Sequence, residues 1–469
     1  MAVFSIAMKR LACSCLLTLA LAANAGAADL VIRNVTVAGV GGAPAVANAT
    51  VIVRGDRIAA IGPAAEVAIA EDARVIDGSG KFLLPGFMEM HAHLSKARAS
   101  SLGLFIVNGV TTVRDLGGDH EELLRWRREI RAGTRVGPRI LMAGPYLEST
   151  ANIERMRKDP VSERIEPFER IRIGVGSPEE ARKIVASLAA KEVDFLKIRT
   201  VANRETYLAL NAAADAHGIP LVGHVYGIPP EVVLASGQDS VEHGFYPTLQ
   251  STSRDERLAV WRQFAARGVP VVPTLVTLFE STFLPRERLH AVTEDAEGKV
   301  DPRRKYISRF SMLDWREQVL EASEERTKNL RKMWDDFARR DLREMHEAGV
   351  EILAGSDVAV VNIYPGFSLH DELALFVSEL GMTPAEAIDR ATRRPARLLR
   401  LGDSVGTVER GKIADLVLLD ADPRQDIRNT RRIAAVIVQG KLYDAPALER
   451  LRAAVVASED LKVDDWGRH

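Results

Sequence analysis

Eight apolar runs, most of them separated by stretches with helical spacing, limit what this chain can fold into more than any other feature. The runs occupy residues 82–93, 109–117, 137–145, 193–199, 219–225, 239–244, 269–276 and 350–357. Most follow one another at about 20 to 35 residues, which suits strand–helix units. Continuous apolar runs are typical of parallel strands buried on both faces. The sequence therefore predicts an α/β fold, a (β/α)8 TIM barrel over residues 82–400.

Two segments are longer than such units need. Residues 148–174 form one insertion. The gap after residue 276 contains a second, from about 280 to 312, with the charged stretch PRERLHAVTEDAEGKVDPRRKY. We interpret this second segment either as a lid over the site or as a solvated excursion of the surface.

Both ends of the chain have a residue pattern that differs from that of the middle. Residues 29–62, 405–423 and 432–443 contain short β-branched runs broken by Gly, Asn and Asp, which indicate hairpins. We therefore expect a small β-sandwich domain assembled from residues 29–81 and 401–469.

The first 28 residues resemble a secretory signal peptide. Lys9 and Arg10 precede an apolar segment, Leu11 to Ala23, and small residues follow it. Both cysteines of the chain lie within this segment, and neither follows the apolar part as a lipid-modified cysteine would. The sequence predicts an exported protein, periplasmic or secreted, without a stable membrane anchor. Its mature chain would bind metal only through nitrogen and oxygen atoms.

The charge balance indicates the kind of partner. The chain has 63 basic and 64 acidic side chains and a formal net charge of −1. Such a chain has no global field that attracts nucleic acid or an anionic membrane. We expect a small-molecule substrate, and association between copies of the chain stays open.

Ligand-type residues lie at the ends of several predicted strands. A single histidine at a strand end is ordinarily a hydrogen-bonded core residue, but barrel active sites gather at the carboxyl ends of the strands. Neutral imidazole and carboxylate are the groups that bind zinc and similar ions. The predicted metal site consists of His91, His93, Lys197, His224, His243 and Asp357. The ends of the other three runs, Asp115, Pro145 and Thr274, do not continue this pattern.

Lys197 lies inside an apolar run. Burial beside cations disfavours the ammonium form, so such an amine would be neutral and able to add CO2, forming a carbamate that bridges two metals. The alternative is a surface amine paired with Glu192 or Asp194; the apolar neighbours of Lys197 argue against it.

Several motifs together resemble the amidohydrolase superfamily, in particular its imidazolonepropionase-like and prolidase-like branch of metal-dependent dipeptidases. They are LLPGFMEMHAHL, GVTTVRDLGG, LKI, GH, EHG, AGSD, SLHDELALFVSELGMTPAEAIDRAT and GTVERGKIADLVLLDADP, spread over residues 29 to 445. This family combines a (β/α)8 barrel with a β-sandwich made from both termini.

The resemblance implies a binuclear centre with two divalent ions, in the first place Zn²⁺. His91, His93 and Asp357 would hold the more buried ion, and His224 with His243 the more exposed one. N6-carboxylated Lys197 and a hydroxide would bridge the ions, with Asp357 as general base and acid. Tyr226 would either donate to the carbonyl oxygen of the substrate or be structural.

Weaker candidates stay open. Asp115 would either support a ligand histidine or simply end its strand. His370 and Glu372 would orient the Asp357 loop, contact substrate or be structural. The arginines of RMRKDP would grip a substrate carboxylate or form a solvated charge run. The positions of the remaining histidines, in helices, an insertion or the tail, indicate no relation to the site: His120, His217, His290, His346 and His469.

The predicted activity is that of a metal-dependent hydrolase of C–N amide bonds, acting on a dipeptide or an N-acyl amino acid. The same ligand set would serve a cyclic amide, a lactone or a phosphoester. A mononuclear deaminase is disfavoured because Lys197 would then have no task. An inactive binding protein that keeps the barrel would not be expected to retain all six ligands.

Overall fold

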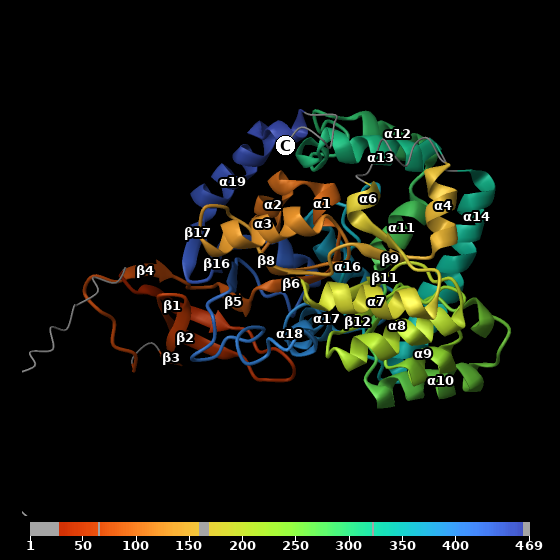
Figure 1. The fold of residues 1–469 in the computed structure, drawn as a ribbon. Coiled ribbons are helices and arrows are strands. Elements are labelled where there is room, and N and C mark those ends of the chain that lie inside the picture. Colours follow the sequence, from red (N-terminus) through yellow and green to blue (C-terminus); the bar gives the residue numbers. More distant parts are fainter. Residues whose placement is uncertain (1–27, 64–65, 159–167, 321–322, 463–469) are drawn as a thin grey trace, which may run out of the picture.

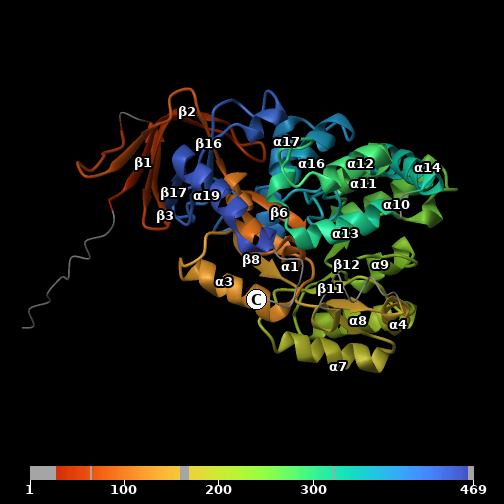
Figure 2. The same cartoon turned by 90° about the horizontal axis from the view of Figure 1, so that it is seen from above.

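The computed structural model describes residues 28–63, 66–158, 168–320 and 323–462. Parallel strands with helices packed around them form the larger part of the molecule (Figures 1 and 2). The strands of this part are β6 (Phe87–Ala92), β7 (Val110–Asp115), β8 (Arg139–Met142), β11 (Leu196–Ile198), β12 (Leu221–Gly223), β13 (Ser240–Glu242) and β14 (Val271–Val272). Each lies within one of the predicted apolar runs.

The eighth run, residues 350–357, joins the two ends of this series. It forms isolated parallel bridges, Ile352 with Val271 of β14 and Val358 with Ala92 of β6. The Met90 amide also donates to the Ala354 carbonyl over 3.1 Å. These contacts place residues 350–358 between β14 and β6, as a closed barrel requires.

The helices follow the strands as the spacing predicted. In the first half of the barrel they are α1 (Leu94–Ala97), α2 (Leu102–Val107), α3 (His120–Arg131), α7 (Pro178–Ala189), α8 (Arg204–Ala216), α9 (Pro230–Ser236) and α10 (Arg254–Arg267). In the second half they are α15 (Leu342–Glu347), α16 (Phe367–Ser378), α17 (Pro384–Asp389) and α18 (Arg393–Leu398).

Local sequence signals account for where several helices begin and end. Ser253 and Glu256 form a reciprocal capping box at the start of α10, and Thr383 with Glu386 repeats it at α17. Gly268 ends α10 with a φ of +67°, a left-handed conformation that favours glycine. These boundaries are encoded within a few residues of each helix end.

Both ends of the chain contribute to a separate eight-stranded sheet, which stands beside the barrel (Figures 1 and 2). Its strands are β1 (Leu30–Val37), β2 (Val46–Arg54), β3 (Arg57–Pro63), β4 (Arg74–Asp77), β5 (Phe82–Pro85), β15 (Leu416–Leu419), β16 (Ile433–Val438) and β17 (Lys441–Asp444). Helix α19 (Ala445–Ala457) follows β17. The expected union of the two chain ends is therefore present. A two-layer sandwich stays a prediction, because the hydrogen bonds define one sheet.

The first apolar run is divided between the two sheets. β5 pairs with β15 and β1 in the terminal sheet, whereas β6 begins the barrel two residues later. Gly86 lies between them, where a Cβ atom would come within 2.1 Å of the Thr111 hydroxyl oxygen. Residues 82–85, expected in the barrel, thus belong to the terminal sheet.

The two insertions are folded. Between residues 148 and 174 the described part contains α4 (Thr150–Arg157), α6 (Phe168–Ile171) and β10 (Arg172–Gly174), which pairs with β9 (Tyr146–Glu148). The second insertion, from about 280 to 312, contains the end of α11 (Leu275–Phe283), all of α12 (Arg286–Glu294) and the start of α13 (Arg309–Leu320), and α14 (Glu324–Met333) follows it.

The second insertion is not a solvated excursion. Leu289, Val292 and Trp315 are buried in one cluster with Val361 and Tyr364, which follow the eighth strand run. The Val361 amide also donates to the Gln318 side chain over 3.1 Å. These helices therefore cover the segment that follows Asp357.

The predicted signal peptide lies outside the described residues, apart from its final residue. A search of the described residues for a helix both long and apolar enough to cross a bilayer finds none.

Candidate metal centre

Three residues that lie far apart in the sequence of the barrel come together at the carboxyl ends of its strands. The Asp357 Oδ1 atom lies 3.5 Å from His91 Nε2 and 3.3 Å from His93 Nε2. One ligand atom from each residue fits within 4.8 Å of the others, close enough for a single ion. The alternation of β6 turns both imidazoles to one face, and the barrel brings Asp357 beside them.

His91 is oriented by a buried ion pair. Its Nδ1–H donates to Glu242 Oε2 over 2.9 Å, which leaves Nε2 directed at Asp357. Arg114 donates to the other oxygen of Glu242 over 2.7 Å and to the Met90 carbonyl over 2.7 Å. Arg114, Glu242 and His91 are each at most 1% exposed. A carboxylate behind a ligand histidine fixes its tautomer and ring orientation.

Burial and neighbouring charges determine the charge states of Glu242, His91 and Asp357. Burial alone would raise the pKa of Glu242, but Arg114 and His91 hold it well below its usual range. Burial lowers the pKa of His91 to about 3, so its imidazole is neutral, the form that binds metals. Burial opposes ionisation of Asp357 as well, and the neighbouring His91 and His93 rings hold its pKa low.

His93 and His243 have their own orienting partners. His93 Nδ1 lies 3.0 Å from the Tyr146 hydroxyl and 3.3 Å from the Gly117 carbonyl. His243 Nδ1 lies 2.7 Å from Thr274 Oγ1, whose own hydrogen goes to the Pro273 carbonyl. The Thr274 oxygen therefore accepts from His243, leaving His243 Nε2 as the free nitrogen.

A second buried carboxylate aligns the two strands that carry the triad. Glu89 accepts from the His91 amide over 2.9 Å and from the Ser356 amide and hydroxyl over 2.8 and 2.7 Å. Gly355 lies so close to β6 that a Cβ atom there would be 2.8 Å from the Cβ of His91. Asp357 follows with a φ of +58°, an uncommon backbone conformation for aspartate.

Lys197 and His224 form the other part of the predicted site. Lys197 lies on β11 and is 1% exposed, and its Nζ atom has no hydrogen-bond partner among the described residues. His224 follows β12, and its Nδ1 atom is equally buried and unpartnered. The His224 ring lies 4.8 Å from the ring of His243, which in turn lies 5.0 Å from the ring of His91. The structure thus brings the predicted residues into one cluster.

Burial lowers the pKa of Lys197 to about 8, although Glu242 and Asp357 favour its charged form. A buried polar atom without a partner costs free energy, and native proteins seldom leave one. The predicted alternative for Lys197, a surface amine paired with Glu192 or Asp194, is wrong. Glu192 and Asp194 pair with Arg128 and Arg127 instead.

The other candidates lie elsewhere or act indirectly. Asp115 accepts from the Leu94 and Gly117 amides, so it supports the backbone beside His93 rather than an imidazole. His370 contacts Thr430 and the Asn108 carbonyl. Glu372 accepts from the Leu275 and Val276 amides, next to Thr274.

Tyr226 is 55% exposed and its ring lies 4.8 Å from that of His224. The described arginines of RMRKDP contact Asn152 and Glu169 at the surface. His469 lies outside the described residues. The other histidines judged unrelated lie on helices outside this cluster: His120, His290 and His346, with His217 directly after α8.

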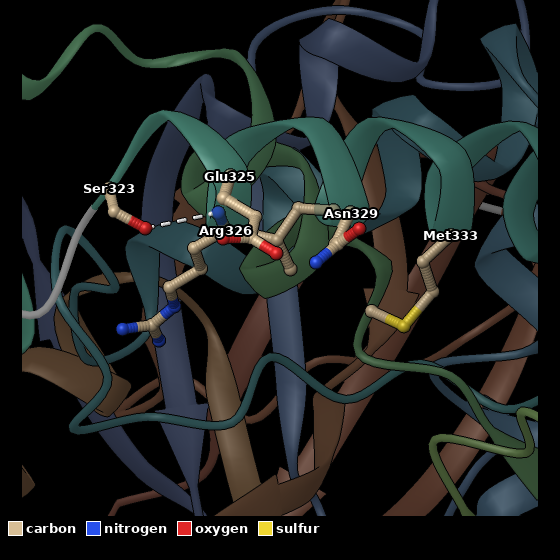
Figure 3. A pocket seen from close by; sticks show the side chains of 6 residues that line it. Ser323, Glu325, Arg326, Asn329 and Met333 are labelled. Carbon is tan, nitrogen blue, oxygen red and sulfur yellow. Dashed lines mark hydrogen bonds between the residues drawn. The ribbon is translucent and has the colours of Figure 1, made fainter.

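A hollow along α14 lies apart from the metal-ligand cluster in its lining residues. It is lined by Ser323, Glu325, Arg326, Asn329, Leu330 and Met333. Figure 3 shows the Ser323 hydroxyl accepting from the Arg326 amide at the start of the helix. This hollow contains none of the predicted metal ligands.

Sequence reasoning did not select Glu89, Arg114, Tyr146 or Glu242. Three of them carried a readable signal, since a charged residue inside an apolar strand run requires a buried partner. Tyr146 carried none, because only the fold places it beside His93.

Comparison with known proteins identifies the family. Residues 82–443 match the amidohydrolase family. The chain belongs to this family. The matched residues include every predicted ligand, and members of this family are metal-dependent hydrolases that typically act on C–N bonds.

Its relatives differ in activity. The imidazolonepropionase of Streptomyces coelicolor is 27% identical over 390 residues, 80% of this chain and 86% of that protein. The adenine deaminase of Desulforamulus reducens is 26% identical over 86% of this chain, which spans only 56% of that enzyme's length. Among solved structures, a prolidase-like protein from Bifidobacterium longum has a TM-score of 0.69 at 25% identity, covering 92% and 99% of the two chains. A Xaa-Pro dipeptidase has the same fold, with a TM-score of 0.64 at 21% identity.

The residues present fit a metal centre in this amidohydrolase. The His91–His93–Asp357 group offers two imidazole nitrogens and a carboxylate around one point. Lys197 Nζ and His224 Nδ1 are buried atoms that no described residue hydrogen-bonds. Nitrogen and oxygen donors of this kind suit zinc and its neighbours.

Proposed function

We propose that this amidohydrolase hydrolyses the C–N amide bond of a dipeptide or an N-acyl amino acid at a binuclear centre, with Zn²⁺ as the first candidate ion. His91, His93 and Asp357 would hold one ion, and His224 and His243 the other. The observation that carries the proposal is the close approach of Asp357 to both β6 imidazoles, 3.5 and 3.3 Å. The unpartnered amine of Lys197 supports a second ion.

Lys197 is proposed to carry an N6-carboxyl group. Its neutral amine would add CO2, forming one N–C bond and releasing one proton. The resulting carbamate has two oxygens and a negative charge, which suits a bridging ligand. A pKa of about 8 keeps enough neutral amine for this addition near neutral pH.

Two divalent ions, when bound, lower the pKa of a coordinated water and polarise the scissile carbonyl. The residues of the chain would then manage the protons. Asp357 would accept the proton of the attacking water and pass it to the leaving amine. Tyr226 would donate a hydrogen bond to the carbonyl oxygen, since it follows His224 at the exposed side of the cluster.

The Tyr226 role has a direct test. Tyr226→Phe is expected to lower kcat about 10- to 100-fold with little change in KM, because a donor to developing charge acts mainly on the transition state. A kcat within about threefold of the unchanged protein would reject this role and leave Tyr226 as a structural residue.

The activity itself is tested with metal-free protein and protein loaded with zinc, cobalt or manganese. We expect about two equivalents of metal and hydrolysis of some members of a panel of dipeptides and N-acyl amino acids. Because a relative is an imidazolonepropionase, the panel includes a cyclic amide. Full folding with no bound metal and no hydrolysis would reject the proposal.

We also propose export of the chain, based on its first 28 residues. Expression of the full sequence, followed by cell fractionation and sequencing of the mature N-terminus, tests this. Cleavage near Ala28 is the expected result, and association of copies can be measured on the same material.

A further inference from the structure

The seventh strand run ends without a predicted ligand, but Thr274 at its end orients one. This residue joins β14 to α11, and its Oγ1 atom accepts from His243 Nδ1 over 2.7 Å. Thr274 has a φ of +49° and a ψ of +49°, a left-handed conformation that is rare for a β-branched residue. Such a backbone persists only where its surroundings fix it. A neighbouring group must therefore hold Thr274 in place.

That group is the Glu372 carboxylate on α16, the helix that packs beside α11 (Figures 1 and 2). Glu372 is 0% exposed. Its Oε1 atom accepts from the Leu275 amide over 2.9 Å, and its Oε2 atom accepts from the Val276 amide over 2.6 Å. The first amides of a helix have no acceptor within the helix, and its N-terminus favours negative charge. Glu372 thus fixes the two peptide groups directly after Thr274.

The same helix also contacts the segment around Asp357. Thr277 and Glu280 are three residues apart, so they share a face of α11. The Thr277 hydroxyl donates to the Ser356 carbonyl over 2.9 Å, directly before Asp357. Glu280 accepts from the side-chain amide of Asn362, which follows Asp357 with a φ of +63°. Helix α11 therefore holds the backbone on both sides of Asp357.

We propose that Glu372 is a positioning residue of the metal centre, acting through α11 on His243. The inference rests on the proposed centre, in which His243 and Asp357 belong to different halves. Because α11 is bonded to His243 and to the segment around Asp357, a shift of its first turn would change the direction of His243 Nε2 and its distance from Asp357. A buried partner behind a ligand imidazole fixes its tautomer and orientation. Here that partner is Thr274, and Glu372 holds Thr274.

The test replaces Glu372 by glutamine, which keeps the shape but places an NH2 group opposite an amide of α11. In metal-free protein with isotope-labelled histidine, the nuclear magnetic resonance spectrum should show a His243 proton fixed on Nδ1, assigned by its absence in His243→Asn. Glu372→Gln should lose this signal because the Thr274 oxygen moves. Its affinity for the second equivalent of zinc, measured by chelator competition, should fall about 10- to 100-fold, and that for the first less than about threefold.

Further variants separate positioning from general damage to the fold. His370→Asn removes another buried hydrogen-bonding side chain of α16 and should leave the His243 signal and both zinc affinities unchanged. Thr274→Val should lose the signal as Glu372→Gln does. The double variant should bind zinc no more weakly than Thr274→Val alone, because Glu372 acts through Thr274.

Three results would overturn the proposal: no fixed Nδ1 proton on His243 in the unchanged protein, an unchanged signal in Glu372→Gln, or the same losses in His370→Asn. Losses of zinc affinity that add up in the double variant would do so as well. Should Glu372→Gln not fold, Glu372→Asp is judged by the same criteria, since the shorter side chain cannot bond both amides from the same position.

The positioning role and the proposed function fail in different ways. Loss of the His243 signal and of the second zinc in Glu372→Gln, without hydrolysis by the unchanged protein, would reject the amide hydrolase and keep the role of Glu372. Hydrolysis together with an unchanged His243 signal in Glu372→Gln would keep the hydrolase and reject that role. Absence of zinc binding by the unchanged protein would reject both.

Discussion

The two halves of the metal centre are built differently. In the half formed by β6 and the eighth strand run, His91 has Glu242 behind it, His93 has Tyr146, and the backbone before Asp357 is held by Glu89. In the half formed by β11 and β12, Lys197 Nζ and His224 Nδ1 are buried and have no hydrogen-bond partner in the part of the chain that the structure describes. The first half is held in place by hydrogen bonds within the protein, whereas these two atoms of the second half are not.

The difference suggests an order of assembly. A preorganised ligand set loses little entropy when an ion binds, so the first half should bind metal more tightly. The second half contains a buried amine and a buried imidazole nitrogen without hydrogen-bond partners among the described residues, and such atoms cost stability until a ligand reaches them. The predictions below separate these two behaviours.

The largest effect is expected from the ligands of the preorganised half. His91→Ala or His93→Ala should lose metal and activity together, with a fall in kcat/KM of about 10³-fold or more, because these residues act as a unit. Elemental analysis and circular dichroism check this on the same samples. Full metal content with lost activity would contradict the ligand role.

Removing the support behind His91 should act on both folding and metal binding. Glu242→Gln leaves Arg114 buried without its counter-charge and should destabilise the protein by about 3–5 kcal/mol. Zinc affinity should fall about 10- to 100-fold, as for other carboxylates behind ligand histidines. Urea unfolding of metal-free protein and chelator competition measure the two effects. The matched control is Glu231→Gln on the exposed side of α9; an affinity equal to this control contradicts the proposed support.

Replacing Lys197 should have the opposite effect on stability in metal-free protein, where it should raise the free energy of unfolding. Lys197→Met replaces an unpartnered buried amine with an apolar side chain of similar length and should raise the free energy of unfolding by about 1–3 kcal/mol. The bound metal should fall from two equivalents towards one. The exposed Lys191→Met is the control for both measurements. Lower stability of Lys197→Met without metal would show that the amine has a stabilising role in the free protein.

A buried histidine outside the centre gives the smallest effect. Burial lowers the pKa of His370 to about 3, below its usual value near 6.5, so only the unfolded chain gains a proton between these values. His370 therefore contributes stability above pH 6.5 that is lost as the pH falls towards 3. Between pH 6.5 and 5.5 the loss is about 1 kcal/mol.

His370→Asn should remove that part of the acid dependence, measured by urea unfolding at each pH. His217→Asn, at an exposed position after α8, is the control. An unchanged slope in His370→Asn would mean that the imidazole is charged in the folded protein.

Much of the fold and the predicted ligands could be read from local patterns. Continuous apolar runs, helical spacing and capping residues act within a few residues, so seven strands and many helix ends were predictable. The division of the first run at Gly86 was not, because β5 pairs with β15, more than 300 residues later. The helices of the second insertion escaped prediction for a similar reason, since their apolar faces pack on one another and on Val361.

The sequence by itself determined that histidine, lysine and aspartate lie at the strand ends, because the spacing of the apolar runs is enough to locate those ends. Only the tertiary structure decided which nitrogen of each imidazole is free and which polar atoms stay unpartnered. Those properties depend on Glu242, Thr274 and Tyr146, which reach the histidines from other strands. Closing the barrel brings these groups together, and hydrogen bonds a few ångströms long cannot be inferred from positions far apart in the chain.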